Sequence, residues 1–196
     1  MAEPDSRPMR ADARRNRERI LEVALREFTR LGSDATLDAI AKSAGVGAGT
    51  LYRHFPTREA LVEAVYRNEV ARVCDAVPTL LENATPDVAL REWMSRFIDY
   101  MTTKSGMADA LRALLAPGGE CFAQSRDRLR EAIAVLLDAG VRHGSLRAGV
   151  DPEDVLTGLS GIALTSGEPA QRARADRLLD LLMDGLRYHA EAGSAR

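Results

Sequence analysis

Apolar residues recur at helical spacing along most of the chain. Between residues 10 and 31, Ile20, Ala24 and Phe28 follow one another at intervals of four, while arginines occupy the opposite face. Positions four apart lie on one face of an α-helix, so this spacing predicts an amphipathic helix that ends at Gly32. Apolar and polar residues do not alternate over strand lengths. The pattern therefore predicts an all-α chain of about nine helices.

Capping side chains, prolines and glycines mark the boundaries of the other helices. The predicted ranges are 37–44, 47–55, 58–81, 86–103, 106–116, 120–143, 152–166 and 170–190. Residues 1–9 contain two prolines and little apolar material, so we expect a flexible arm there. Two domains are predicted, one over residues 1–57 and a second, helical one over residues 58–196.

Residues 45–61, GVGAGTLYRHFPTREAL, have the spacing of a helix-turn-helix together with the short helix before them. Thr36 can cap that first helix, Gly45 tolerates the positive φ that the turn needs, and the second helix ends near Phe55. Ala41 is small where the two helices cross. The residues predicted to fill the shared core are Ile40, Val46 and Leu51.

Charge is distributed unevenly along a chain whose net charge is −2. Residues 1–58 contain 11 Arg and Lys against 8 Asp and Glu, and residues 59–196 contain 16 basic and 21 acidic residues. A basic first part suits a protein that presents one end to phosphates. Cys74 and Cys121 have no metal-ligand spacing, and no cofactor motif is found. We expect a cytoplasmic protein, since neither a membrane-spanning apolar run nor a signal segment is found.

Residues 15–62 resemble the tetracycline-repressor (TetR) family of bacterial transcription regulators: a basic amphipathic helix precedes TLDAIAKSAGV, GAGTLYRHF and PTREAL. The resemblance implies a recognition helix at residues 47–55, whose N-terminal end enters the DNA major groove, and a C-terminal ligand-binding and dimerisation domain. The residues expected to contact DNA are Arg10, Arg14, Arg15, Thr36, Gly47, Ala48, Thr50, Tyr52, Arg53, His54 and Arg58.

The chain departs from the family at Gly47 and Ala48, where relatives often have a polar pair such as Ser-Lys. A long side chain is therefore missing at the leading edge of the recognition helix, and Gly47 and Gly49 lower its helix propensity by about 1 kcal/mol each. We expect the arginines of the N-terminal arm, Arg10, Arg14 and Arg15, to compensate by binding phosphates or entering the minor groove.

Aromatic and methionine residues are densest between Trp93 and Met101. This cluster can be ordinary core, or it can line the cavity of a sensor domain. The candidate ligand-binding residues are Tyr66, Trp93, Met94, Phe97, Tyr100, Met101, Met107, Leu111 and Phe122. They favour a mostly apolar organic effector, for which Arg112 or Arg126 is a candidate anion anchor.

The last two predicted helices combine leucines with small residues, which permit close helix approach. In the TetR family this pair meets its copy across a two-fold axis as a four-helix bundle. The candidate dimer residues are Val155, Gly158, Leu159, Ile162, Leu178, Leu182 and Leu186. Packing within one chain is the alternative. Dimerisation is favoured because two helix-turn-helix units about 34–36 Å apart read a palindrome.

The sequence thus predicts a homodimeric regulator, most consistent with a repressor, that binds a palindromic DNA operator and is released by a small organic effector. The alternatives are a transcriptional activator and an architectural DNA-binding protein without a small ligand. An all-helical enzyme is disfavoured, because no nucleophile elbow, HExxH motif or phosphate-binding glycine loop occurs in the sequence.

Overall fold

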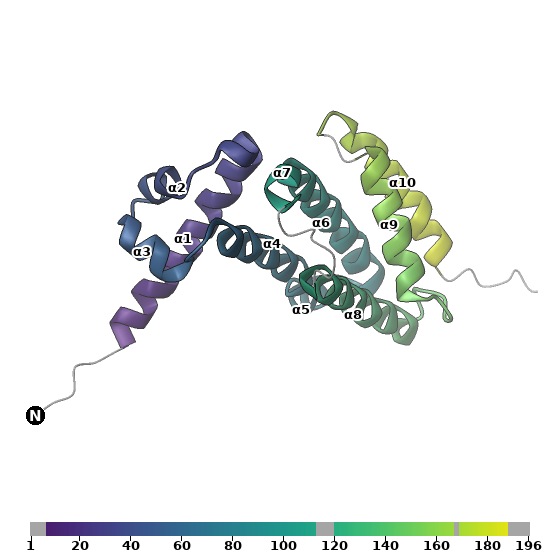
Figure 1. The fold of residues 1–196 in the computed structure, drawn as a ribbon. Helices are drawn as coiled ribbons and strands as arrows, with labels where there is room; N and C mark the ends of the chain where they lie inside the picture. Colours follow the sequence, from purple (N-terminus) through teal and green to yellow (C-terminus); the bar gives the residue numbers. More distant parts are fainter. Residues whose placement is uncertain (1–6, 113–119, 167–168, 188–196) are drawn as a thin grey trace, which may run out of the picture. The chain divides into compact units, whose positions relative to one another are not determined.

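The computed structural model describes residues 7–112, 120–166 and 169–187, and side chains within 12–112, 122–166 and 170–187 (Figure 1). Packing divides the chain into two compact units. Unit 1 contains the described residues up to Asn68 together with those from Gly106 to Arg112. Unit 2 contains Glu69–Ser105 and the described residues from Glu120 onward. The domain boundary predicted at residues 57 and 58 stays a prediction.

Unit 1 is built around a long first helix and a helix-turn-helix. Its elements are α1 (Arg7–Leu31), the 3-10 turn η1 (Gly32–Asp34), α2 (Leu37–Ser43), α3 (Ala48–His54), the first part of α4 (Arg58–Cys74) and α7 (Ala108–Leu111). Helix α2 packs on both α1 and α3, and η1 packs on α1 and α7. The predicted stripe of α1 forms the core, since Ile20, Ala24 and Phe28 are fully buried.

Unit 2 is a helical assembly in which α9 packs against both α8 and α10, and α5 packs against α8. Its elements are the rest of α4, α5 (Val77–Asn83), α6 (Pro86–Gly106), α8 (Glu120–His143), α9 (Pro152–Ser166), η3 (Pro169–Gln171) and α10 (Arg172–Leu186). Its largest fully buried side chains include Trp93 and Phe97 of α6. The structure confirms the all-α prediction, and in the described residues extended pairing is limited to one isolated bridge, between Leu146 and Arg187.

The helix predicted over residues 58–81 is two helices, which is a correction to the sequence analysis. Helix α4 ends at Cys74 and α5 begins at Val77. Pro78 accounts for the break, because a proline inside a helix has no N–H and its ring clashes with the carbonyl four residues earlier, here that of Cys74. Proline is tolerated in the first turn of a new helix, where α5 places it.

Helix α1 begins earlier in the chain than predicted. Residues 7–9 belong to α1, and residues 1–6 lie outside the described part of the chain. The helix predicted over residues 106–116 is described only as α7, and residues 113–119 also lie outside. Among the described helices, none has both the length and the apolar character that crossing a membrane requires.

Candidate nucleic-acid interface

The turn between α2 and α3 has the predicted geometry. The hydroxyl oxygen of Thr36 accepts a hydrogen bond from the backbone N–H of Ala39 at 3.2 Å, which caps the first turn of α2. Gly45 has φ of +63°, a left-handed conformation that glycine adopts without steric cost. The N–H of Val46 then donates to the carbonyl of Ala41 at 3.0 Å. These contacts fix the path of the chain into α3.

Apolar side chains hold α2 and α3 together. Ile40 and Leu51 are fully buried, and Ala41 is nearly so. Val46, which we predicted to be core, is half-buried. Phe55 at the end of α3 is buried, and the guanidinium carbon of Arg17 lies 5.4 Å from the centroid of its ring. Arg17 thus ties α1 to the end of α3, a contact that sequence spacing does not reveal.

The outer face of α3 begins with a stretch that has almost no side chains. Gly47, Ala48 and Gly49 are all exposed. A Cβ atom built on Gly49 meets nothing within 4 Å, so the protein itself does not demand glycine there. Tyr52 follows one turn later with 43% of its surface exposed, and Thr50 is half-buried. This face can approach a partner closely while presenting one phenol.

Arg53 supplies a long polar side chain near that bare edge. Its Nε donates to the carbonyl oxygen of Gly49 at 3.1 Å, and its Nη2 donates to the hydroxyl of Thr50 at 3.3 Å. The side chain therefore lies back along α3 towards the N-terminal turn. Because a guanidinium has five N–H donors, most of the fork remains available for a base edge or a phosphate.

Arg58 at the start of α4 faces the protein. Its Nη2 donates to the carbonyl of Gly32 at 2.8 Å, and its Nη1 donates to the carbonyl of Ala35. The guanidinium carbon lies 5.0 Å from the centroid of the Phe28 ring. Its predicted contact with the DNA backbone is untested, and the structure gives this side chain a packing role in unit 1.

The arginines predicted to reach DNA from the N-terminal arm lie on α1. Arg14 is 3.8 Å from Glu18, and Arg15 pairs with Asp12 on the same exposed face. Such exposed pairs contribute little to stability, so phosphate can compete for these arginines. Arg10 is helical, and its side chain lies outside the described ones. His54 is half-buried, with its ring centroid 6.1 Å from that of Phe55. The DNA contacts of these three arginines and of His54 stay predictions.

The aromatic cluster of α6 is packed inside unit 2. Trp93 is fully buried, its ring centroid lies 5.9 Å from that of Phe97, and the Phe97 centroid lies 5.8 Å from that of Tyr100. The indole N–H of Trp93 donates to the carbonyl oxygen of Val73 at 3.0 Å. That carbonyl belongs to the last turn of α4 and has no acceptor role within the helix, so the indole caps it. These contacts favour the core interpretation.

The other candidate ligand-binding residues are distributed over both units. Met94 is buried and Met101 half-buried in unit 2, where the side-chain ammonium of Lys104 lies 5.4 Å from the centroid of the Phe122 ring. Tyr66, Met107 and Leu111 are buried residues of unit 1.

The two candidate anion anchors are exposed and paired, Arg112 with Asp109 and Arg126 with Glu153. Ligand binding by these two arginines and by the apolar candidate residues stays a prediction.

The predicted dimer residues divide into buried and accessible sets. Val155, Leu159 and Leu186 are buried, whereas Ile162, Leu178 and Leu182 are half-buried and Gly158 is exposed. Two leucines that the sequence analysis did not single out are more exposed than any of these apolar residues. Leu164 of α9 is 82% exposed, and Leu181 of α10 is 67% exposed. Helical spacing alone did not distinguish them, because each lies beside the stripe that packs within the chain.

Comparison with known proteins identifies both parts of the chain. The family model for bacterial regulatory proteins of the tetR family matches residues 20–65, and the model for the C-terminal domain of SbtR-like transcriptional regulators matches residues 85–188. A TetR transcriptional regulator from Streptomyces coelicolor is 56% identical, with a TM-score of 0.81, over 89% of this chain and 99% of that one. A TetR regulatory protein from Mycobacterium vanbaalenii is 36% identical, with a TM-score of 0.76, over 92% and 100%.

A curated relative, the helix-turn-helix transcriptional regulatory protein RaaS of Mycobacterium tuberculosis, is 28% identical over 134 residues, which are 68% of this chain and 61% of RaaS. The chain therefore spans less than two thirds of the length of the curated relatives that it matches first. These matches confirm the resemblance to the TetR family that residues 15–62 indicated, and they extend it through unit 2.

Proposed function

Because the chain belongs to the TetR family of DNA-binding transcription regulators, we propose that it is a homodimeric repressor, released from a palindromic operator by a small organic effector. The observation that supports DNA reading is the outer face of α3, where a glycine-rich edge is followed by exposed Tyr52 and Arg53. Helix α3 packs on α2, whose first turn is capped by Thr36. It acts in the cytoplasm, where bacterial DNA is accessible to it.

In this proposal α3 lies in the major groove with its N-terminal turn towards the bases. The bare edge at Gly47 to Gly49 permits close approach of the backbone. Arg53 reads a guanine with its fork, or holds a phosphate, and Tyr52 supplies a phenol to a base or sugar edge. Thr36 and His54 bind the DNA backbone, and Arg14 and Arg15 add sequence-independent attraction along α1.

The proposed dimer forms through α9 and α10. Those two helices pack against each other, yet Leu164 and Leu181 remain largely exposed. Apolar side chains of this exposure on neighbouring helices indicate a surface that a partner covers. A second copy is the occupant consistent with a two-fold operator, because one recognition helix spans too few base pairs for a specific site.

Effector release is proposed to act through α4. This helix runs without interruption from Arg58 to Cys74. Its first residue is bonded to carbonyls of unit 1, and Val73 near its end is bonded to Trp93 in unit 2. An effector that favours a different position of α4 shifts the population between DNA-binding and released forms only by its difference in affinity for the two.

The test is selection of binding sites from randomised duplex DNA by the purified protein, followed by sequencing of the retained pool. We expect an enriched palindrome whose half-sites are about one helical turn apart. Arg53→Gln should lose most of the enrichment, whereas Arg130→Gln on α8, an exposed arginine paired with Asp127, should retain it. Binding that is salt-sensitive but without enrichment would instead support an architectural role. A transcription assay from the selected operator would then separate repression from activation.

A further inference from the structure

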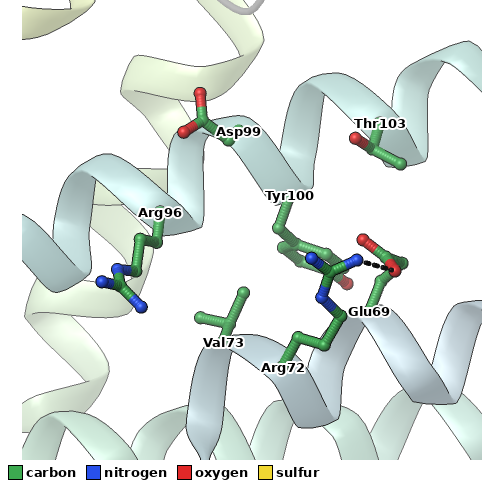
Figure 2. A pocket seen from close by; sticks show the side chains of 7 residues that line it. All are labelled: Glu69, Arg72, Val73, Arg96, Asp99, Tyr100 and Thr103. Carbon is green, nitrogen blue, oxygen red and sulfur yellow. Dashed lines mark hydrogen bonds and ion pairs between the residues drawn. The ribbon is translucent and has the colours of Figure 1, made fainter. Parts of the chain in front are cut away.

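Unit 2 contains a cleft between the end of α4 and the middle of α6. It has a volume of about 280 Å³ and is lined by Glu69, Arg72, Val73, Arg96, Asp99, Tyr100 and Thr103 (Figure 2). Ligand sites for drug-sized molecules measure roughly 300–1,000 Å³, so this cleft suits a smaller, metabolite-sized molecule. Of the residues that the sequence predicted to bind a ligand, Tyr100 alone lines this cleft.

The back of the cleft is firmly built. Val73 and Tyr100 are 6% and 4% exposed, and they offer an apolar and aromatic wall. The carbonyl of Val73 is bonded to the buried indole of Trp93, so the end of α4 is held on α6 directly behind that wall. A preformed wall lowers the cost of ordering a bound molecule.

Two arginines, Arg72 and Arg96, are the charged hydrogen-bond donors that line the cleft, beside two carboxylates that already have basic partners. Asp99 accepts a hydrogen bond from Arg172 of α10, which also donates to the hydroxyl of Ser95 at 2.6 Å. The negative charge of Asp99 is therefore balanced from outside the cleft. The carboxylate of Glu69, which is 15% exposed, is paired with Arg72, and Arg96 is paired with Glu92, which does not line the cleft.

Both arginines retain donors for a ligand. A dashed line joins Arg72 and Glu69 in Figure 2. Their N–O distance is 3.5 Å, which is longer than a good charge-assisted hydrogen bond. Arg96 pairs with Glu92 at 2.6 Å in an exposed contact along α6, of a kind that contributes little to stability. Each guanidinium has five N–H donors, and its planar fork matches a carboxylate. A carboxylate ligand can therefore replace these partners.

We propose that this cleft binds a small organic carboxylate, whose anionic group is held by Arg72 and Arg96 and whose apolar body lies against Val73 and Tyr100. The hydroxyl of Thr103 completes the polar rim one turn further along α6. Such a ligand bridges α4 and α6. Its effect on operator binding rests on the proposed function, whereas the binding itself does not.

The experiment is an NMR titration of the full chain without DNA, using acetate, benzoate and octanoate as probes. Benzamide is the neutral isostere of benzoate, and benzylamine is the cationic control. Trp93 is the only tryptophan in the sequence, so its indole N–H gives one resonance that reports on the wall of the cleft. We expect saturable shifts with benzoate or octanoate, and at least tenfold weaker binding of acetate, benzamide and benzylamine.

Variants locate the site. Arg72→Gln and Arg96→Gln should each weaken carboxylate binding at least fivefold, and Arg130→Gln, which removes an exposed arginine from α8, should leave it unchanged. Far-UV circular dichroism and thermal unfolding confirm that each variant folds. Absence of saturable binding by all three carboxylates overturns the proposal. Affinity that is equal in the Arg72→Gln/Arg96→Gln double variant, or equal for benzamide, also overturns it.

The titration is separable from the proposed function. If carboxylates bind but do not change operator affinity, the proposed binding site stands and its proposed regulatory role is wrong. Loss of operator binding in every assay would contradict the proposed function and leave the titration result standing.

Discussion

The Nη2 atom of Arg58 lies 2.8 Å from the carbonyl oxygen of Gly32, and this bond joins the first residue of α4 to η1, which directly follows α1. The other terminal nitrogen donates to Ala35, directly before the capping residue of α2. Gly32 has φ of +55° and lies beyond the last residue of α1, where a carbonyl has no partner within the helix, and Arg58 supplies the donor. One side chain thus positions α4, the α1–α2 turn and the start of the helix-turn-helix.

We predict that Arg58→Gln lowers the free energy of unfolding by about 2 kcal/mol, because two partly buried carbonyls lose a charged donor. Arg58→Lys should recover little of this loss, since an ammonium cannot reproduce the planar fork. Urea denaturation monitored by circular dichroism measures both values.

Arg53→Gln is the matched control for stability, since the hydrogen bonds of Arg53 stay within α3. It should unfold at nearly the same urea concentration as the parent protein. If Arg58→Gln were as stable as the parent and bound DNA with a reduced salt dependence, Arg58 would be a phosphate contact, and the packing role argued above would be wrong.

Gly49 tests how closely α3 approaches DNA. A Cβ atom at this position meets no atom within 4 Å apart from its chain neighbours and the backbone of its own helix, and alanine has the higher helix propensity. Gly49→Ala should therefore raise the free energy of unfolding by roughly 0.5–1 kcal/mol. We also expect it to weaken operator binding at least tenfold, because the added methyl group lies on the face proposed to enter the groove. Stability and affinity would move in opposite directions, whereas unchanged affinity would place the backbone at this position away from the DNA.

Local signals predicted the elements of unit 1 well. Thr36, Gly45 and Leu51 each have a role that depends on the nearest few residues: a cap, a left-handed turn and a buried helix position. In unit 2, the predicted ranges 120–143 and 152–166 coincide with α8 and α9. The break between α4 and α5 was missed because the apolar stripe continues across it, although Pro78 was the available signal.

Long-range contacts account for what the sequence did not predict. Arg58 binds carbonyls 23 and 26 residues away, and no local pattern distinguishes that contact from an exposed arginine at a helix start. Trp93, Phe97 and Tyr100 follow the spacing expected both for core and for a cavity wall. The hydrogen bond to the carbonyl of Val73 and the stacked rings favour a role in the core of unit 2. The cleft lies beside Tyr100, and most of its lining residues are charged, so a search for apolar residues did not identify them.

The exposed leucines of α9 and α10 allow a test of the dimer. Leu164→Arg and Leu181→Arg should each weaken self-association by about 3 kcal/mol or more, which is over a hundredfold, because a charge would be buried without a partner. Analytical ultracentrifugation measures the association, and the helical content should not change. Val88→Arg on α6, where valine is 50% exposed, is the control and should remain associated like the parent. A dimer that survives both leucine substitutions would have to form elsewhere.

Cys74 is expected to be an unreactive thiol at neutral pH. Burial raises its pKa from 9.0 to about 11; the nearby carboxylates of Asp75 and Glu131 act in the same direction, and the guanidinium of Arg128 opposes them. The thiolate is the reactive form, so at pH 8 the folded chain should react with iodoacetamide about a hundredfold more slowly than a short peptide with the same flanking residues. The rate should rise with pH up to about 11.

A Cys121→Ser background confines the alkylation measurement to one thiol. Because the folded state holds the proton of Cys74 more tightly than the unfolded state, the contribution of this group to stability is fully present below pH 9 and is lost as the pH rises towards 11. Arg128→Gln removes the opposing positive charge and should move the rate profile to still higher pH. A profile with its midpoint at or below pH 9 would show that water reaches the sulfur, and that Cys74 is not desolvated beside the end of α4.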